Sequence, residues 1–599
     1  MPKLVDTTIR LLSQEPLAGK VPTGEVLRVA EILDKAGFAC LEVSGGGVFE
    51  LAVRRAVESP WERIRALDAR TTTPLGIALR GRFLVGSKPV SADVVRRFIA
   101  SASENGIDVF RLHDPLNDVS NLREAGEAIV GAGKTFHAGL VFSAGTGAID
   151  TLVEQAKPIP ELGATLVVIN DPTDALKPHL TEELVQRVAE ATGLPVGLYV
   201  QGAAGTGLSN ALVATRVGAD LVATAVYPLA LTLHRVAGES LVEMLHGLGR
   251  ETGVDIERLW EADDVIDEHI GDEPVAPMAP RIAVRAAEYD LPASLVRALD
   301  VHLRARAAGD RLLDTLDELR RVREEAGSPP LAAPIGHILA TQAMNNVLFA
   351  SRYLRVSDEF QMLVEGGYGA TPAPIDDAVA RVVELRGRSA RLDVEDPPSV
   401  EDVAGESAGL AASEEDLVLL AMFGEEAKAL LEGIRARHSG STSLITGDVD
   451  AGRAERIREL VKIVQESGVG EIEIEDDGMR VSVRRADETV GPTVHVGIAG
   501  EEELTPGPVP AQNGLDRVES PMPGVVYRAP DPGSPPFVDV GSVVAKGQTL
   551  CLIEAMKLFN ELKAEGDALV RAVHVDNAQP VEYGQLLFEL EPVAGPPAL

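Results

Sequence analysis

The sequence has few cysteines, a shortage of positive charge and no long apolar run. Its two cysteines, Cys40 and Cys551, are too few for a disulfide framework, which fits a reducing compartment. No segment approaches the roughly 18 apolar residues of a membrane helix, and residues 1–6 contain no apolar signal-peptide core. Because 56 Lys+Arg stand against 92 Asp+Glu, the net charge of −36 repels nucleic-acid phosphates and anionic lipids. These absences predict a cytoplasmic protein that binds neither nucleic acid nor membranes.

What is present is the balance of a soluble globular protein, with 45% apolar and 25% charged residues over 599 positions. A chain of this length exceeds one ordinary hydrophobic core and predicts about three to four domains.

Residues 1–290 alternate short apolar runs with amphipathic stretches, as successive βα units do. Eight runs begin near Leu4, Phe38, Pro74, Val109, Phe136, Leu166, Pro195 and Leu221. Eight such repeats predict an α/β TIM barrel with its chemistry at the C-terminal strand ends. The same alternation also fits a doubly wound open sheet.

The remaining chain changes character three times. Residues 291–435 have helical periodicity and predict a helical extension, and residues 450–485 predict a small α/β segment of one helix and two strands. Residues 486–516 are rich in Gly, Pro, Thr and Glu and predict a flexible linker. Residues 517–599 alternate Val/Leu-rich segments with Pro/Gly turns and predict an all-β domain.

The clearest motif is Glu554-Ala555-Met556-Lys557, placed between two strand-like segments where a lysine would be exposed at a hairpin tip. With the Ser520-Pro521-Met522 and Gln579-Pro580-Val581 segments, residues 518–593 resemble the biotinyl domain of the biotin carboxyl carrier protein of bacterial acetyl-CoA carboxylase. An insert at 529–539 resembles that carrier's thumb, and residues 450–485 resemble its N-terminal segment. The resemblance implies a flattened barrel and covalent biotin on Lys557, within the Glu554, Ala555, Met556 recognition segment.

Residues 1–435 resemble a second biotin-dependent family, the carboxyltransferase subunit of pyruvate carboxylase, oxaloacetate decarboxylase α and transcarboxylase 5S. The matching segments are Asp6-Thr7-Thr8-Ile9-Arg10, Leu41-Glu42-Val43, Pro60-Trp61-Glu62-Arg63, Leu79-Arg80-Gly81, Glu104-Asn105-Gly106-Ile107-Asp108, Leu116-Asn117-Asp118-Val119, Thr341-Gln342-Ala343 and Gly369-Ala370-Thr371-Pro372. The resemblance implies a barrel with a helical extension.

The family's metal site does not carry over. Its Asp, carbamylated Lys and two His ligands correspond here to Leu11, Asn170, Tyr199 and Gln201, its proton-shuttling Thr to Ala333, and a Gly-Gly pair to Leu231-Thr232. Without anionic or imidazole ligands we expect no metal. The matches Arg10, Gln14 and Arg80 remain, either as a carboxylate clamp or as structural hydrogen-bond donors. The sequence therefore favours a non-catalytic barrel kept as a scaffold.

Two glycine-rich segments are weaker signals. Gly131-Ala132-Gly133-Lys134-Thr135 resembles the end of a phosphate-binding loop but runs from helix to strand, which predicts a helix C-cap. Ser44-Gly45-Gly46-Gly47 is explained by a tight barrel loop. Since no ATP-binding loop is evident, another chain would carboxylate the biotin.

These features lead to one main hypothesis and two alternatives. The main hypothesis is a biotin carboxyl carrier subunit of a multi-subunit acetyl-CoA or acyl-CoA carboxylase for fatty-acid synthesis. Its expected partners are a biotin carboxylase, carboxyltransferase subunits and a biotin protein ligase, in an oligomeric complex. The first alternative is an active pyruvate carboxylase or oxaloacetate decarboxylase carboxyltransferase subunit with a rebuilt site. The second is a biotinylated scaffold without a carboxylation role.

Overall fold

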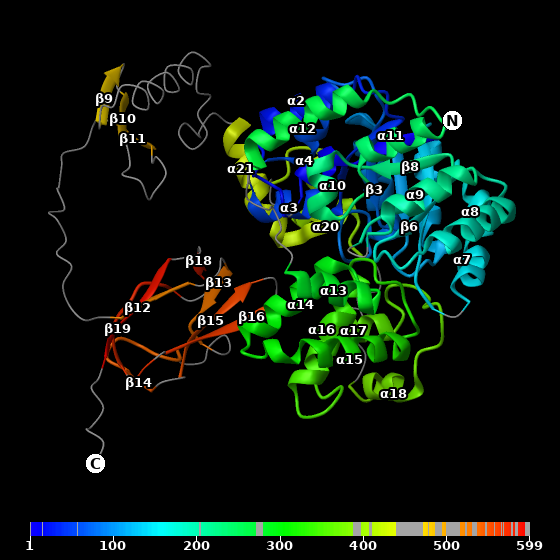
Figure 1. Cartoon of the computed structure of the whole chain (residues 1–599). Helices are drawn as coiled ribbons and strands as arrows, with labels where there is room; N and C mark the ends of the chain where they lie inside the picture. The colour runs from blue at the N-terminus through cyan, green and yellow to red at the C-terminus, as the bar shows by residue number, and fades with distance from the viewer. Residues whose placement is uncertain are drawn as a thin grey trace. The chain divides into compact units, whose positions relative to one another are not determined.

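The computed structural model divides the chain into two compact units, Met1–Thr442 and Ser443–Leu599 (Figure 1). Within the first unit it describes residues 2–438 except 15, 57, 146, 203–204, 271–278, 387–396 and 407–409. Within the second it describes residues 471–476, 479–484, 494–498 and most of 516–592.

Eight parallel strands close into a barrel in the first unit. They are β1 Lys3–Asp6, β2 Cys40–Gly45, β3 Leu75–Leu79, β4 Ile107–His113, β5 Thr135–Val141, β6 Leu166–Asp171, β7 Val196–Val200 and β8 Leu221–Thr224. Closure is direct, because β1 pairs with β8 in parallel, with Lys3 opposite Leu221. The predicted TIM barrel is confirmed, and the open-sheet alternative is excluded by this pairing.

Helices surround the strands because each presents an apolar stripe to the sheet. The barrel helices are α1 Thr8–Leu12, α2 Thr23–Leu33, α3 Gly46–Arg55, α4 Pro60–Asp68, α5 Ala92–Glu104, α6 Arg123–Gly131, α7 Ala148–Ala156, α8 Pro178–Thr192, α9 Gly207–Arg216, α10 Tyr227–Leu233, α11 Gly238–Gly247 and α12 Ile256–Ile270. Short 3₁₀ turns lie at η1 Gly81–Phe83, η2 Val119–Leu122 and η3 Ile159–Leu162. In α5, for example, Val94, Val95, Phe98 and Ile99 are buried at helical spacing, and the Ser91 side chain caps the N-terminus.

The helical extension has a hydrophobic core of its own, with Leu316, Leu319 and Leu339 fully buried. Its helices are α13 Pro280–Tyr289, α14 Ala293–Ala305, α15 Leu312–Glu325, α16 Ile335–Leu348, α17 Asp358–Val364 and α18 Asp377–Leu385, with η4 at Gly309–Arg311. The helical extension meets the barrel at the C-terminal ends of the barrel strands. There Phe83 of η1 stacks on Tyr368 of the extension, with ring centroids 5.6 Å apart. The extension therefore covers the end of the barrel at which catalysis is expected.

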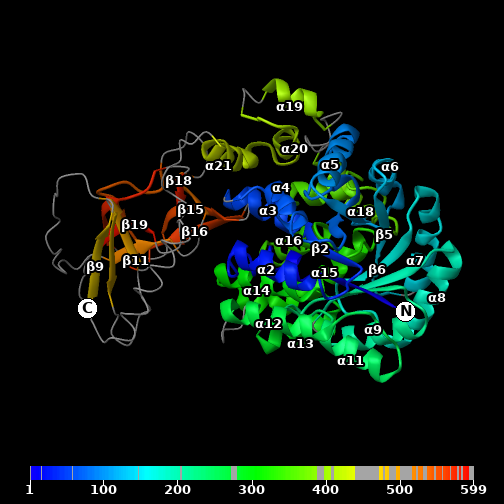
Figure 2. The same ribbon diagram turned by 90° about the horizontal axis from the view of Figure 1, so that it is seen from above.

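The last helices of the first unit return to the barrel. They are α19 Val400–Glu406, α20 Glu414–Phe423 and α21 Lys428–His438, with η5 at Gly424–Ala427. Val418, Leu419 and Leu430 are buried in the barrel's core cluster, not in that of the helical extension. Figure 2 shows α20 beside α5. The sequence predicted helices here but not this return, because periodicity does not reveal which neighbour a buried face contacts.

The second unit begins with a three-stranded sheet of β9 Glu471–Asp476, β10 Met479–Arg484 and β11 Val494–Ile498 in the order β11-β10-β9. The two strands predicted at 470–484 are present, whereas the helix predicted at 452–467 lies outside the described residues. β11 lies inside the segment predicted as a linker, which is a correction. It forms because Val494, Val496 and Ile498 alternate and pair antiparallel with β10.

Two four-stranded sheets form the C-terminal domain and share a core that includes Val526, Leu550 and Phe588. Their strands are β12 Asp516–Glu519, β13 Gly524–Tyr527, β14 Val543–Val544, β15 Thr549–Ala555, β16 Leu558–Lys563, β17 Ala568–Val573, β18 Gln579–Val581 and β19 Leu586–Pro592. The predicted all-β domain of two small sheets is confirmed.

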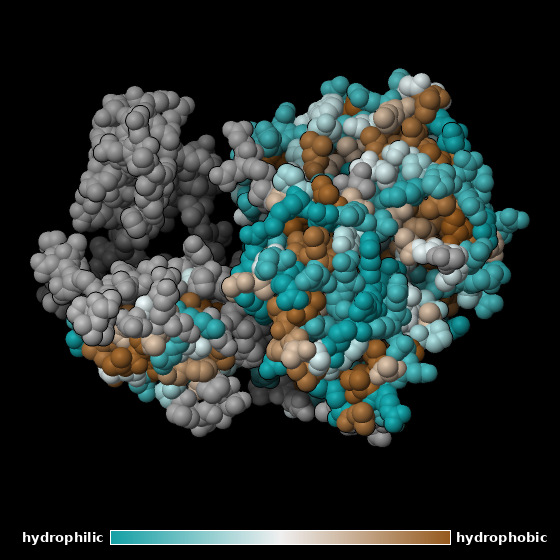
Figure 3. Space-filling model, turned by 60° about the horizontal axis from the view of Figure 1, so that its bottom comes forward, coloured by the Kyte–Doolittle hydropathy of each residue, from teal (hydrophilic) through white to brown (hydrophobic). Residues whose placement is uncertain are grey.

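The surface is charged, as the composition requires. Figure 3 shows hydrophilic residues over most of the coloured surface, interrupted by separate hydrophobic areas. Among the described residues, no helix combines the length and apolarity that a membrane crossing requires.

Three carboxyl groups are buried where α11 and α12 approach β1. Asp6 is 1% exposed, Glu239 1% and Asp263 8%, and neither carboxyl oxygen of Asp263 has a hydrogen-bond partner. Burial, with Glu239 and Asp264 nearby, raises the pKa of Asp263 to about 8. Asp263 is therefore protonated in the folded protein at neutral pH, and folding stability falls as pH rises toward this pKa.

We expect Asp263→Asn to raise the free energy of unfolding at pH 8 by about 1–3 kcal/mol, because a neutral amide removes the cost of ionising a buried carboxyl. The difference in unfolding free energy between the variant and the wild type should shrink toward pH 4, where the buried Asp263 carboxyl is as neutral as the Asn amide. Urea unfolding followed by fluorescence measures this in the first unit, since both tryptophans, Trp61 and Trp260, lie there. Glu268→Gln, also exposed on α12 and not among the groups that raise this pKa, is the matched control. An equal effect of the two changes would contradict the assignment.

Candidate active site at the barrel mouth

The three residues that sequence resemblance singled out in the barrel lie at the C-terminal ends of β1–β3. Arg10 is on α1, directly after β1, and its Nε lies 2.8 Å from Glu42 Oε1. Arg80 follows β3, forms an ion pair with Glu50 at 3.1 Å, and donates to the Gly86 carbonyl at 3.0 Å. Gln14 lies against Gly47: a Cβ there would be 2.9 Å from Gln14 Oε1. The structure therefore brings Arg10, Gln14 and Arg80 to one region.

The glycines after β2 make this close approach possible. β2 ends at Gly45 and α3 begins at Gly46, so the predicted tight loop is present. A Cβ on Gly46 would lie 2.6 Å from Arg80 Nη2, so a larger residue would displace that guanidinium. The Gly131–Thr135 segment, in contrast, ends α6 and enters β5, which confirms the predicted C-cap.

A buried ion pair crosses the barrel interior. Glu42 on β2 accepts from Nε and Nη2 of Arg111 on β4, at 2.9 and 3.2 Å, and both residues are at most 5% exposed. Burial alone would raise the pKa of Glu42, but Arg10 and Arg111 lower it to about 2. Glu42 is therefore ionised at any physiological pH and fixes two guanidinium groups beside it.

Tyr199 occupies part of the region in which the resembling family binds metal. Its hydroxyl donates to Glu42 Oε2 at 3.1 Å, and its ring lies beneath the Arg111 guanidinium, 4.1 Å from the ring centroid. Asn170 on β6 is its register partner. Leu11 is fully buried in the barrel core, and Gln201 follows β7 and pairs by its backbone with Arg235.

Arg235 adds a further cation, which forms no ion pair with any acidic residue that the structure describes. Its Nε is buried without a hydrogen-bond partner. Burial and the nearby Arg10 and Arg111 lower its pKa to about 9, so it stays protonated at neutral pH. Arg235 is thus close to Arg10 and Arg111, and these three arginines share one nearby carboxylate, that of Glu42. Such a site attracts an anion.

Neutral imidazoles border the same region. Burial and the Arg111 and Arg80 charges lower the pKa of His113 to about 3, and burial and Arg111 lower that of His137 to about 4. His337, at the start of α16, has a pKa lowered by desolvation and by Arg80, although its surface remains accessible. It lies four residues after Ala333, the position corresponding to the family's shuttling threonine.

The residues at the four ligand positions do not fit a divalent metal ion. Leu11 is apolar and buried, and the Tyr199 hydroxyl is engaged with Glu42. Across the part of the chain that the structure describes, no group of three His, Cys, Asp or Glu residues could hold a metal ion. The Arg111 guanidinium, itself a cation, lies over the ring of Tyr199 at one of these positions.

The predicted biotin site lies on the second unit. Glu554 and Ala555 end β15, which pairs antiparallel with β16, with Ala555 opposite Leu558. Met556 and Lys557, between these paired ends, lie outside the described residues, so the lysine's geometry stays a prediction.

Three protein families match the chain in succession. Residues 1–266 match the family described as "HMGL-like", residues 288–482 the "Conserved carboxylase domain", and residues 516–590 "Biotin-requiring enzyme". The second match runs through β9 and most of β10, so it includes residues 450–482.

Whole-chain similarity decides the family. A pyruvate carboxylase subunit of Methanocaldococcus jannaschii is 31% identical over 567 residues, covering 93% of this chain and 94% of that protein. The chain belongs to this family of pyruvate carboxylase subunits. The 2-oxoglutarate carboxylase large subunit of Hydrogenobacter thermophilus is 29% identical, covering 97% of this chain and 96% of that protein.

The fold of this pyruvate carboxylase family member also matches a solved structure. The carboxyl transferase domain of Rhizobium etli pyruvate carboxylase with pyruvate superimposes with a TM-score of 0.65 at 21% identity, covering 83% of this chain and 88% of that one. At this identity the likeness concerns the fold.

The acetyl-CoA carboxylase hypothesis is wrong, and with it the expected role in fatty-acid synthesis. Subunits of pyruvate carboxylase and 2-oxoglutarate carboxylase match over nearly the whole chain, barrel included, whereas that hypothesis rested on the C-terminal quarter. The physical reason is that a biotinyl domain must present one lysine to its ligase and partners, whatever the acceptor. Its motif therefore carries little information about the acceptor.

Sequence reasoning missed the central residues of the mouth. Glu42, Arg111, Arg235 and His337 were not singled out, although Glu42 stood within a matching segment. A signal was present for two of them: Glu42 and Arg111 interrupt apolar strands that a barrel buries. Opposite charges in two buried strands predict an ion pair, because neither charge is stable there alone.

Proposed function

We propose that this chain is the biotin-bearing carboxyltransferase subunit of a 2-oxo acid carboxylase, acting on pyruvate or a closely similar 2-oxo acid. The observation that carries the proposal is whole-length similarity to a pyruvate carboxylase subunit together with an arginine-rich barrel mouth. The reaction class is transfer of a carboxyl group to the carbon next to a carbonyl.

The arginines account for binding of a 2-oxo acid. The substrate carboxylate would accept hydrogen bonds from Arg235, whose buried Nε has no other partner, and would feel the charge of Arg10. Glu42 holds Arg10 and Arg111 in place, so little reorganisation is needed when the substrate binds.

Arg111 would then stabilise the negative charge that develops on the ketone oxygen when the adjacent carbon loses a proton. Its Nε and Nη2 bind Glu42, which leaves Nη1 outside that pair. A fixed guanidinium in a buried site can replace part of the stabilisation that a metal ion supplies elsewhere. We therefore propose that the rebuilt site works without metal.

His337 is our candidate for moving the substrate proton. Its lowered pKa keeps the imidazole neutral, so that it can accept a proton near Arg80. In the resembling family a threonine hydroxyl shuttles this proton, and Ala333 stands at the corresponding position without a hydroxyl. His337 would perform that proton transfer here.

Biotin, when attached to Lys557, supplies the carboxyl group that is transferred. Because both whole-length relatives are named as subunits, one of them as a large subunit, we propose a separate biotin carboxylase as partner. A biotin protein ligase would load the lysine.

The test is the reverse half-reaction, biotin-dependent decarboxylation of oxaloacetate by the purified chain with free biotin, which needs neither ATP nor the partner. We expect turnover to persist after exhaustive chelation, with no stoichiometric metal by elemental analysis. Arg235→Gln should raise KM for the 2-oxo acid about tenfold or more, as expected for a lost charged hydrogen bond. His337→Gln should lower kcat and flatten the pH profile with KM little changed. Activity that disappears on chelation and returns with one metal equivalent would contradict the metal-free site.

A further inference from the structure

His113 has a buried ring nitrogen that the proposed mechanism leaves unused. Its Nδ1 has no hydrogen-bond partner among the described residues. Folded proteins pair nearly all buried polar atoms, so an unpaired one needs a physical explanation. His113 is the last residue of β4, at the barrel end where catalysis is expected. Its position therefore places it on the substrate side of the barrel.

The side chain of His113 lies on the inner face of the barrel. Side chains alternate between the two faces of a strand, so His113 shares the face of Arg111. Arg111 binds Glu42 across the barrel, which identifies this face as the interior. Gly139 on β5 leaves room for the imidazole, because a Cβ at Gly139 would lie 3.0 Å from His113 Cβ.

Cations surround the imidazole and keep it neutral. Burial and the charges of Arg111 and Arg80 lower the pKa of His113 to about 3. Arg10 acts in the same direction and Glu42 in the opposite one. Beside three cations, a buried ring nitrogen is more stable as a lone pair than as an N–H group, whose positive end the cations repel. The proton of the neutral ring then lies on Nε2.

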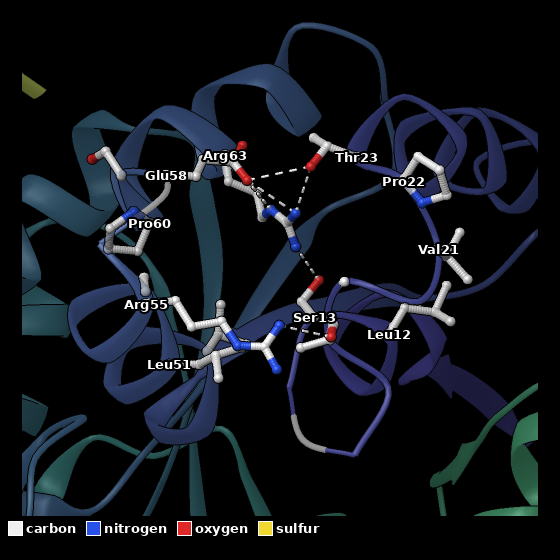
Figure 4. A pocket seen from close by; sticks show the side chains of 15 residues that line it. Leu12, Ser13, Val21, Pro22, Thr23, Leu51, Arg55, Glu58, Pro60 and Arg63 are labelled. Carbon is white, nitrogen blue, oxygen red and sulfur yellow. Dashed lines mark hydrogen bonds and ion pairs between the residues drawn. The ribbon is translucent and has the colours of Figure 1, made fainter. Parts of the chain in front are cut away.

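One of these cations is held in place from outside the mouth. Arg63 on α4 donates from Nη1 to Ser13 Oγ at 2.7 Å, at the edge of a cavity between α1, α3 and α4 (Figure 4). Ser13 Oγ donates in turn to the Ile9 carbonyl at 2.7 Å. α1 is thereby tied to α4, which keeps Arg10 beside Glu42. The charges around His113 are therefore in place before a substrate binds.

Arg111 and His113 present two donors from the same face of β4. Arg111 Nη1 lies outside the pair with Glu42. His113 is partly exposed, and no hydrogen bond engages its Nε2 within the described part of the chain. Side chains two residues apart on a strand begin about 7 Å apart, which lets a long Arg and a His converge on one atom.

We propose that His113 is a catalytic residue whose Nε2–H donates to the ketone oxygen of the 2-oxo acid, beside Arg111. When the C–H bond next to the carbonyl breaks, its proton goes to the base and its electron pair forms the carbon–carbon double bond. The carbonyl π pair then moves to the oxygen, where the two donors stabilise the negative charge. A neutral imidazole can polarise a carbonyl in this way and keeps its proton. This role rests on the proposed function.

Binding of an enolate analogue to the full chain tests the donor without turnover. Oxalate places a negatively charged oxygen where the enolate of pyruvate has one, whereas propanoate has no oxygen at that position. In His113→Phe we expect oxalate to bind about tenfold or more weakly, because a charge-assisted hydrogen bond is lost. Propanoate binding should change little. Calorimetry measures oxalate, and competition in ligand-observed NMR measures propanoate.

Two further variants test which ring nitrogen acts. The amide nitrogen of Gln can stand at the position of Nε2, and that of Asn at the position of Nδ1. His113→Gln should keep most of the oxalate affinity, and His113→Asn should lose it as His113→Phe does. In the decarboxylation of oxaloacetate with free biotin, His113→Phe and His113→Asn should lower kcat about 100-fold with KM little changed. His179→Gln, exposed on α8, should behave like the wild type.

Unchanged oxalate binding by His113→Phe, or equal losses in His113→Gln and His113→Asn, would overturn the role of His113 alone. Urea unfolding followed by tryptophan fluorescence verifies that each variant is folded, and the comparison of Gln with Asn remains decisive if His113→Phe does not fold. A wild type that neither binds oxalate nor decarboxylates oxaloacetate would overturn the proposed function, and the role of His113 with it.

Discussion

A Lys557→Arg variant should carry no biotin and should lose ATP-driven carboxylation of its 2-oxo acid completely when combined with the partner biotin carboxylase. Arginine keeps the positive charge of the segment but has no primary amine with which to form an amide to biotin. The barrel of the same variant should still decarboxylate oxaloacetate with free biotin, because its arginine cluster lies in the other unit. A streptavidin blot and the two assays measure these three outcomes.

The matched control is Lys563→Arg, which changes the lysine at the far end of β16 from the 555–558 junction. It should be biotinylated and active like the wild type. Biotin on Lys557→Arg, or its loss from Lys563→Arg, would contradict the assignment of the attachment lysine.

The alternation of apolar runs predicted the barrel strands closely. All eight observed strands begin within two residues of the predicted starts, because a buried parallel strand must be an apolar run bounded by polar turns. The structure was less predictable in segments whose fold depends on tertiary contacts with distant parts of the chain. Helices α19–α21 return to the barrel, and Val494–Ile498 pairs as a strand within a segment of low apolar content. Both outcomes depend on contacts that local composition does not encode.

The candidate site was predictable in part for a similar reason. The prediction that Leu11 and Tyr199 replace metal ligands came from the family resemblance. That the Tyr199 ring would lie beneath Arg111 and its hydroxyl bind Glu42 depends on strands β2, β4 and β7 meeting inside a closed barrel. The sequence therefore suggested an empty scaffold, whereas the structure has a connected cluster with an excess of positive charge.

The second large effect should come from Glu42→Gln. This change removes the carboxylate that Arg10, Arg111 and Tyr199 share and leaves Arg111, 5% exposed, as a buried cation without a counter-charge. Removing one partner of a buried ion pair costs about 3–5 kcal/mol of unfolding free energy. The variant should also turn over oxaloacetate more slowly in the half-reaction, because Arg10 and Arg111 repel each other once the carboxylate is gone. An exposed pair, Arg216 with Glu182, provides the control: Glu182→Gln should cost at most about 1 kcal/mol.

Two further measurements separate a charge effect from lost packing. The double variant Glu42→Gln/Arg111→Met should recover at least about 1 kcal/mol relative to Glu42→Gln, since it removes the buried cation that lacks a partner. The pKa of Glu42, lowered to about 2 from an ordinary 4.5, means that its ionised form stabilises the fold fully above pH 4.5 and loses this effect as pH falls toward 2. The stability gap between wild type and Glu42→Gln should therefore narrow between pH 5 and pH 3. A gap independent of pH, with no recovery in the double variant, would mean that Glu42 acts through its shape and not through its charge.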